Sequence, residues 1–262
     1  MHRFQPVKKM RTAFRILGYG PDVAWSLFRY RAGMPRKPTS DGLVRVGPDY
    51  FRPCDEPTRD LLLSGLYEAP ERFAAKRYIR RDLPVVEFGG SLGVVACAVN
   101  HQLKDPKRHV VVEANPEILP ILRENRDRNR CEFEIVHGAA GAPGGTVRFY
   151  VGRDTLSSSS VAATQKSVEV PVVTLEEILK SHAFERCGLI CDIEGAELDL
   201  IRNELATLKS QVEIFIVEFH PRISGTEAME ESLRLLKENG FEPLLRHIDT
   251  FALRNTALKR EE

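Results

Sequence analysis

The chain has 262 residues, of which 42% are hydrophobic and 29% are charged, as is ordinary for a soluble globular protein. No apolar run approaches the roughly 20 residues that span a membrane, and the N-terminus shows no secretory signal pattern, so we expect a cytoplasmic protein. The five cysteines form no CxxC pair, which favours reduced, buried thiols over a zinc site.

The N-terminal segment, residues 1–38, is strongly basic. It contains nine lysines and arginines but only one acid, Asp22, so its charge is +8 and the remainder of the chain carries −7. Apolar residues such as Trp25 and Phe28 are interleaved with the bases. This pattern is typical of a segment that contacts an anionic membrane surface or nucleic acid, or of a helix that packs on its own domain or on a second subunit. We expect residues 1–80 to form a helical extension and linker, and residues 81–262 to form the main domain.

From residue 84 onward, short apolar runs alternate with helical patterns. The expected strands cover residues 84–88, 109–114, 131–139, 188–195 and 213–220, with additional strands at 145–152 and 167–173. The helical patterns cover residues 91–104, 115–129, 174–182, 196–209 and 226–240, the second with Asn115 as its cap. The closing runs, 241–248 and 250–255, are separated by one residue and predict an antiparallel pair. This alternation predicts a doubly wound, Rossmann-like α/β sheet whose strands are mostly parallel.

A glycine-rich turn, "EFGGSLG", follows the first strand of the regular region. In doubly wound sheets, ligands bind beyond the carboxyl ends of the strands, where glycines such as Gly89 and Gly93 let the backbone approach them closely. The next strand ends in Glu113, 20 residues after Gly93, where an acid accepts hydrogen bonds from ribose hydroxyls. The pattern therefore predicts a cofactor that contains a nucleoside.

The acid at Glu87 distinguishes between nucleoside cofactors. A carboxylate beside the turn repels the pyrophosphate of a dinucleotide but attracts an ammonium or sulfonium group. Glu87 therefore favours S-adenosylmethionine. Two alternatives stay open from the residues alone: a nicotinamide-dependent oxidoreductase, or Glu87 and Glu113 as solvated carboxylates at strand ends.

Several acids and a histidine follow two later strands, in "CDIEGAE" and "VEFH". Asp192, Glu194, Glu218 and His220 should converge at the same edge of the sheet. They can hold a divalent cation such as Mg²⁺, and we expect its ligands to be Asp192, Glu194 and Glu218. Alternatively, one of them can act as a general base, with Asp192 as the first candidate and His220 as the second. Glu197 is better explained as an acid that interacts with the positive end of a helix dipole.

These motifs carry a family resemblance. The runs "VVEFGGSLG…VVVEANPEILPILRENRDRN…HGAAG" and "VVTLEEIL…LICDIEGAELDLIRN…IFIVEFH", with "SGLYEAPE" upstream, resemble the FkbM family of class I S-adenosylmethionine-dependent methyltransferases over roughly residues 60–245. The resemblance implies a seven-stranded sheet with an antiparallel last strand. It also implies methyl transfer to a hydroxyl oxygen of a sugar, a polyketide or a similar small molecule.

The resemblance also assigns roles by position. It implies that Glu87, Gly89 and Gly93 bind the methionine part of the cofactor, Glu113 the ribose, Asn115 the adenosine and Ala139 the adenine, with Asp192 and Glu194 at the transfer site. One departure is visible, since Ser91 stands where the family usually has an amide side chain.

The acceptor is expected to be a small molecule and not a nucleic acid. The chain has "DIEG" where base-methylating enzymes use an Asn/Asp-Pro-Pro-aromatic loop, and clustered carboxylates repel a phosphate backbone. The serine-rich loop at residues 152–160 is expected to border the acceptor pocket through Ser157–Ser159. A remaining alternative is a non-catalytic binding protein on the same scaffold, recruited to membranes or partners by its N-terminus.

Overall fold

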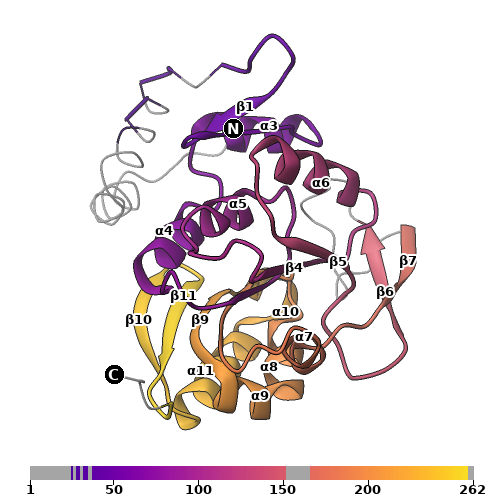
Figure 1. Cartoon of the computed structure of the whole chain (residues 1–262), viewed down its shortest axis with the longest axis vertical. Coiled ribbons are helices and arrows are strands. Elements are labelled where there is room, and N and C mark those ends of the chain that lie inside the picture. Colours follow the sequence, from indigo (N-terminus) through magenta and orange to yellow (C-terminus); the bar gives the residue numbers. More distant parts are fainter. Residues whose placement is uncertain (1–24, 26–27, 30–31, 35–36, 152–165, 259–262) are drawn as a thin grey trace.

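A seven-stranded sheet forms the centre of the molecule (Figure 1). The computed structural model describes residues 25, 28–29, 32–34, 37–151 and 166–258. The strands lie in the order β10-β11-β9-β8-β3-β4-β5. Their bounds are β3 Val85–Phe88, β4 His109–Glu113, β5 Glu134–His137, β8 Cys187–Cys191, β9 Val212–Glu218, β10 Phe241–His247 and β11 Thr250–Asn255.

The direction of the strands confirms the predicted sheet. Strands β5, β4, β3, β8 and β9 pair in parallel, whereas β11 is antiparallel to both of its neighbours, β9 and β10. The chain proceeds from β3 outward to β5 and then returns to place β8 on the other side of β3. The strand order therefore reverses between β3 and β8, and ligands of doubly wound sheets bind at such a point.

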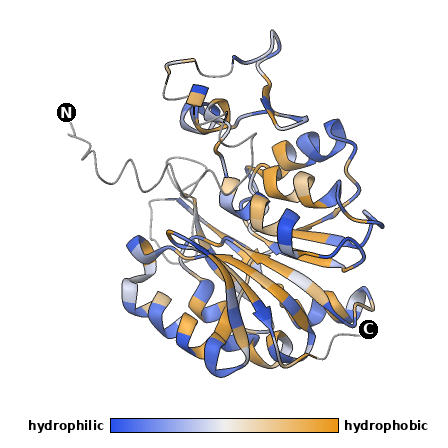
Figure 2. Ribbon diagram, turned by 90° about the vertical axis from the view of Figure 1, so that its left-hand side faces the viewer, coloured by the Kyte–Doolittle hydropathy of each residue, from blue (hydrophilic) through white to orange (hydrophobic). Residues whose placement is uncertain are grey.

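Helices cover both faces of the sheet because successive strand residues point to opposite sides. Val85 packs with α4 and α5, while Val86 packs with α7, α8, α9 and α11 on the other face. The helices are α3 Glu56–Ser64, α4 Ala69–Tyr78, α5 Val94–Asn100, α6 Leu119–Arg128, α7 Leu175–Ser181, α8 Glu197–Asn203, α9 Leu205–Gln211, α10 Pro221–Ser224 and α11 Thr226–Glu238. Figure 2 shows the hydrophobic strands enclosed between helices whose outer surfaces are hydrophilic.

The segment before the regular region contains a feature that the sequence reading did not anticipate. Strands β1 (Val44–Val46) and β2 (Asp49–Phe51) form a short antiparallel hairpin that packs with α3 and α6. Helix α4, also before residue 81, packs against β9 and β11. Most of the basic segment lies outside the described residues, and the boundary at 80/81 stays a prediction. In the described part of the chain, no helix is long and apolar enough to cross a membrane.

Three predicted helices differ from the structure in their limits. The predicted helix 91–104 is shortened to α5, Val94–Asn100, which begins after Gly93 in the left-handed conformation. Helix α6 begins at Leu119 because the Asn115 side chain accepts a hydrogen bond from Glu117 N (3.0 Å) and so stabilises a preceding turn instead of capping the helix. The predicted helix 196–209 is divided at Glu204, whose side chain accepts a hydrogen bond from Leu175 N (2.6 Å).

Three local predictions are confirmed. Thr174 and Glu177 form a capping box at the start of α7. Strands β6 (Thr146–Val151) and β7 (Lys166–Pro171) pair with each other, and β10 pairs with β11. The serine-rich loop between β6 and β7 lies outside the described residues.

Candidate active site

A pocket of about 340 Å³ opens at the carboxyl ends of the central strands, where the strand order reverses. It brings together eight of the residues that the sequence reading proposed. They are Gly89, Glu113, Asn115, Ala139, Asp192, Glu194, Glu218 and His220. Two others, Glu87 and Gly93, do not line it.

Gly89 allows the turns after β3 and β8 to meet. Its φ is +92°, and a Cβ at this position would lie 1.7 Å from the carbonyl oxygen of Asp192. No side chain can be accommodated there without moving one of the two turns. Gly93 has a different structural role. It precedes α5 in the left-handed conformation (φ +79°), and a Cβ at this position would lie only 2.8 Å from Leu122 Cδ1 of α6. It brings α5 close to α6 and does not contact the pocket.

Glu113 joins the two turns on one side of the pocket. One carboxylate oxygen accepts a hydrogen bond from Ser91 N and the other from Asn115 N, both at 2.7 Å. Burial raises the pKa of Glu113, while the backbone hydrogen bonds from Asn115 and Ser91 oppose that rise. The carboxylate is thus held at the end of β4, where the sequence predicts a ribose-binding acid.

Glu87 is buried and does not line the pocket. Only 2% of it is exposed, and its Oε2 lies 3.7 Å from His109 Nε2 without accepting a hydrogen bond. Burial, followed by the charges of Asp192 and Glu113, raises the pKa of Glu87 well above its usual range. Burial also lowers the pKa of His109 to about 3. The contact of Glu87 with the methionine part of a cofactor stays a prediction.

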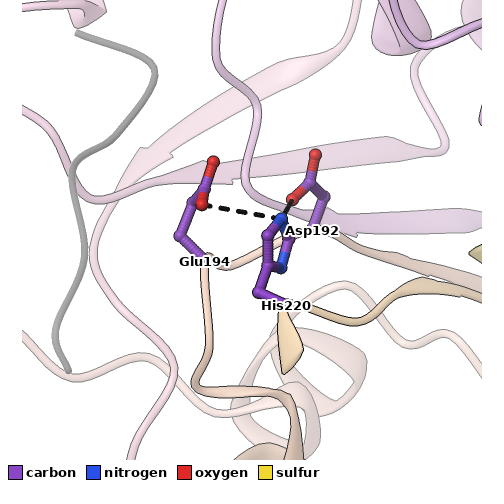
Figure 3. A group of neighbouring side chains, drawn as sticks. All are labelled: Asp192, Glu194 and His220. Carbon is purple, nitrogen blue, oxygen red and sulfur yellow. Dashed lines mark ion pairs between the residues drawn. The ribbon is translucent and has the colours of Figure 1, made fainter. Parts of the chain in front are cut away.

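After strands β8 and β9, His220 lies between two carboxylates (Figure 3). Its Nε2 is 3.4 Å from Asp192 Oδ1 and 3.5 Å from Glu194 Oε2. The potential ligand atoms of these three side chains all lie within 4.8 Å of one another, close enough to share one cation. Glu194 has a φ of +51° in the tight turn after β8, which places its side chain beside that of Asp192.

The charges in this group alter its protonation. Burial lowers the pKa of His220, but the hydrogen bond to Glu197 and the charges of Asp192 and Glu194 outweigh it and raise the pKa to about 9. Burial raises the pKa of Asp192 to about 8 against the opposing charge of His220. Burial also raises the pKa of Glu194. In the absence of another cation, the imidazolium therefore balances part of the negative charge.

Glu218 lines the pocket but lies outside this group. Burial and the charges of Glu71 and Asp192, together with a hydrogen bond to Glu71, raise the pKa of Glu218 to about 11. Among the described residues, the structure places His220, and not Glu218, within ligand distance of both Asp192 and Glu194.

Some pocket residues were not identified from the sequence. Tyr67 donates or accepts a 3.1 Å hydrogen bond with Ser91 Oγ, and Glu68 follows it into the pocket. The "SGLYEAPE" motif signalled this segment but not its contact with the glycine turn. Phe149 of β6 also lines the pocket, and the alternation of β6 could not reveal which of its faces would do so.

The chain matches a known protein family over most of the region that forms the sheet. The profile described as Methyltransferase FkbM domain matches residues 88–243, more than half of the chain. The chain belongs to the FkbM methyltransferase family. This confirms the resemblance read from the motifs, and with it a class I methyltransferase that uses S-adenosylmethionine. The residues present fit that cofactor, because Glu113 is held where the motif predicts a ribose-binding acid and Gly89 adds no side chain to the turn.

Three solved structures show what else this FkbM-family chain is similar to. The precorrin-6y C5,15-methyltransferase of Geobacter metallireducens has 8% identity and a TM-score of 0.47, covering 72% of this chain and 86% of that one. An O-methyltransferase of Bacillus cereus in complex with SAH has 13% identity and a TM-score of 0.47, covering 70% and 79%. A fibrillarin of Methanococcus jannaschii has 13% identity and a TM-score of 0.44, covering 80% of each chain. No curated protein sequence gives a significant match.

Proposed function

We propose that this FkbM-family methyltransferase methylates a hydroxyl oxygen of a small molecule such as a sugar or a polyketide. The observation that carries the proposal is the position of Asp192 Oδ1. This atom is buried, accepts no hydrogen bond in the described part of the chain, and belongs to the same pocket as Glu113. A carboxylate that can accept a proton thus lines the same pocket as the predicted ribose-binding acid.

The chemistry of a hydroxyl acceptor requires such a group. When bound, S-adenosylmethionine would supply a methyl carbon on a sulfonium, which a nucleophile attacks in line while the sulfur leaves with the electron pair of the broken carbon–sulfur bond. An alcohol is a poor nucleophile until its proton is partly removed. Asp192 can take that proton directly, with His220 and Glu194 setting the charge around it.

A cation can assist in the same place. We propose that Asp192 and Glu194 hold a divalent ion such as Mg²⁺, with His220 in the position that the sequence reading gave to Glu218. Two carboxylates and an imidazole suit several divalent ions, and a bound ion lowers the cost of deprotonating a hydroxyl. The closeness of the three side chains supports this arrangement.

The charge of the pocket favours a small acceptor over a nucleic acid. The described lining contains five acids and no lysine or arginine. The acids are Glu68, Glu113, Asp192, Glu194 and Glu218. Within the described lining, only the imidazolium of His220 would offset these acids when a phosphate backbone approached.

A transfer assay tests the proposal. The full chain is incubated with radiolabelled S-adenosylmethionine and a cell extract passed through a membrane that retains protein and nucleic acid. We expect label in a small-molecule product whose methyl group withstands mild base, as an ether does and an ester does not. If label is transferred only in unfiltered extract, and is found there in RNA or protein, the proposal is contradicted. Cofactor binding without transfer to any fraction would instead favour the non-catalytic alternative.

A further inference from the structure

A buried carboxylate lies on the side of His220 that faces away from the pocket. Glu197 Oε1 is 2.7 Å from His220 Nδ1, whereas Nε2 of the same ring faces Asp192 and Glu194. Glu197 is only 1% exposed and does not line the pocket. It therefore cannot touch a substrate, and any effect on the reaction must pass through the histidine.

The same oxygen holds the turn that carries Glu194. Gly195 N donates a 2.9 Å hydrogen bond to Glu197 Oε1. Oε1 of Glu197 thus accepts a hydrogen bond from the backbone next to Glu194 and also contacts the imidazole of His220. Glu197 links the two strand ends that supply the group at the pocket, because Glu194 follows β8 and His220 follows β9.

The backbone on both sides is fixed by other contacts. The carbonyl of His220 accepts hydrogen bonds from Ile223 N (2.9 Å) and Ser224 N (3.0 Å) in α10. Gly195 packs so closely on that helix that a Cβ would lie 2.7 Å from Ile223 Cγ2. Loss of the Glu197 carboxylate should therefore free the imidazole ring while the main chain stays in place.

A histidine whose Nδ1–H is bound by a carboxylate presents Nε2 in a defined direction, and such partners commonly orient histidines in metal and catalytic sites. We propose that Glu197 is a positioning residue that acts through His220. It fixes the ring with Nε2 toward Asp192 and Glu194, where the acceptor hydroxyl or its cation is proposed to bind. The proposal deepens the proposed function and rests on it for the role of His220 in turnover.

The first test observes the imidazole and needs no acceptor. In protein with ¹⁵N-labelled histidine, the His220 ring signals are assigned by their loss in His220→Gln. We expect a hydrogen-bonded Nδ1 proton in the wild type that disappears in Glu197→Ala. In Glu197→Gln, the amide oxygen can still accept from Nδ1 and from Gly195, so the signal should persist with a shift. Unchanged His220 signals in Glu197→Gln and Glu197→Ala would overturn the proposal. If Glu197→Ala does not fold, an unchanged spectrum of Glu197→Gln alone overturns it.

Glu204 provides a matched control. It is a similarly buried acid at the other end of α8, and it accepts a backbone hydrogen bond from Leu175. Glu204→Gln should leave the His220 signals unchanged. If it alters them as Glu197→Gln does, the response reports general loosening of the helix and the proposal is wrong.

The second test uses turnover with an identified acceptor. Glu197→Ala should lower kcat about 10–100-fold, with the KM for S-adenosylmethionine unchanged, and Glu197→Gln should recover part of the loss. A rise in that KM with kcat unchanged would contradict a role through His220. The spectra remain informative even if the acceptor proves not to be a hydroxyl, so failure of the inference and failure of the proposed function are distinguishable.

Discussion

At the scale of single residues, Glu113 has a structural role that bears on its predicted contact with the ribose. Its two oxygens already accept hydrogen bonds from the turns after β3 and β4. A bound ribose must therefore share a carboxylate whose direction is set by the backbone. Such preorganisation lowers the cost of binding because the acceptor does not have to be ordered when the ligand arrives.

The first prediction concerns this carboxylate. Glu113→Ala should weaken the binding of S-adenosylmethionine by about 1.5–3 kcal/mol, since the hydroxyls lose a charged acceptor and the two turns lose their link. Titration calorimetry measures the change. Glu132→Ala, at an exposed acid after the next helix, should leave the affinity as it is. Equal affinity for wild type and Glu113→Ala would remove Glu113 from the cofactor site.

A second residue-scale prediction concerns His109 of β4. Its pKa is lowered to about 3 in the folded chain by burial, against an ordinary value of about 6.5 when unfolded. Between these values the unfolded chain binds the additional proton, so this contribution to stability is complete above about pH 6.5 and is lost as the pH falls. Asn100 and Glu87 face the ring, and Glu87, whose pKa is raised, contributes a slope of the opposite sign.

The contribution of His109 is obtained by difference. Denaturant unfolding at several pH values should show that His109→Gln loses less stability on acidification than the wild type. The difference in slope should reach at most about 1.4 kcal/mol per pH unit. Parallel curves for the two proteins between pH 4 and 6 (about the middle of this window) would show that His109 does not titrate in the way its burial requires.

At the scale of elements, the sequence was most informative about strands that are buried on both faces. β3 and β4 are short apolar runs ended by turn residues, and they were predicted to within one residue at each end because nothing competes with that pattern. The end of β8 was predicted four residues too late, because the polar turn after Cys191 was included in the strand. Helix starts were less predictable. Asn115 has the chemistry of a cap, but its side chain bonds to the turn at Glu117, and only the tertiary structure decides between these alternatives.

The same reasoning explains what could be predicted of the site. Asp192, Glu194 and His220 follow parallel strands, so the rule that strand ends converge was enough to bring them together. The rule gives no side-chain direction. It could not show that Glu87 is buried and absent from the pocket lining, or that Glu197 contacts Nδ1 of His220.

One prediction belongs to the contact between two turns. Gly89→Ala should destabilise the fold by more than about 1 kcal/mol and abolish cofactor binding, because its Cβ would overlap the Asp192 carbonyl. Gly144→Ala is the matched control, with φ +83° and no atom within 4 Å of its added Cβ. Gly144→Ala should lose only the stability that an alanine costs at a positive φ, with no added steric overlap. Thermal unfolding of both variants separates the two effects, and equal losses would mean that the crowding at Gly89 is relieved without cost.

At the scale of the whole molecule, the basic N-terminus is not explained by the pocket. Within the described residues, Trp25 and Phe28 stack at 5.2 Å between ring centroids and are 58% and 53% exposed. Exposed aromatic rings within a segment of charge +8 are suited to an anionic lipid surface. Contact with such a surface stays a prediction.

Cosedimentation tests it. The full chain should bind vesicles of phosphatidylcholine with phosphatidylglycerol and be released by salt, since screening weakens the charge attraction. A variant with Trp25→Ser and Phe28→Ser should bind less. Equal binding to pure phosphatidylcholine vesicles, or no binding to either, would contradict the prediction, and a dimer that dissociates in the same variant would assign the segment to subunit contact.

The measurement that tests the central claim most directly is the turnover of Asp192→Asn beside the wild type, on an identified hydroxyl acceptor. The amide has nearly the size of the carboxylate, so the fold and the affinity for S-adenosylmethionine should be retained. It cannot take the proton of the acceptor or offer full charge to a cation, and the rate should fall by about 10²–10⁴. Inactivation by a chelator and recovery with a divalent ion would assign the loss to a metal ligand. Methyl transfer by Asp192→Asn at the wild-type rate would contradict the account, because the group formed by Asp192, Glu194 and His220 would then not be the catalytic centre.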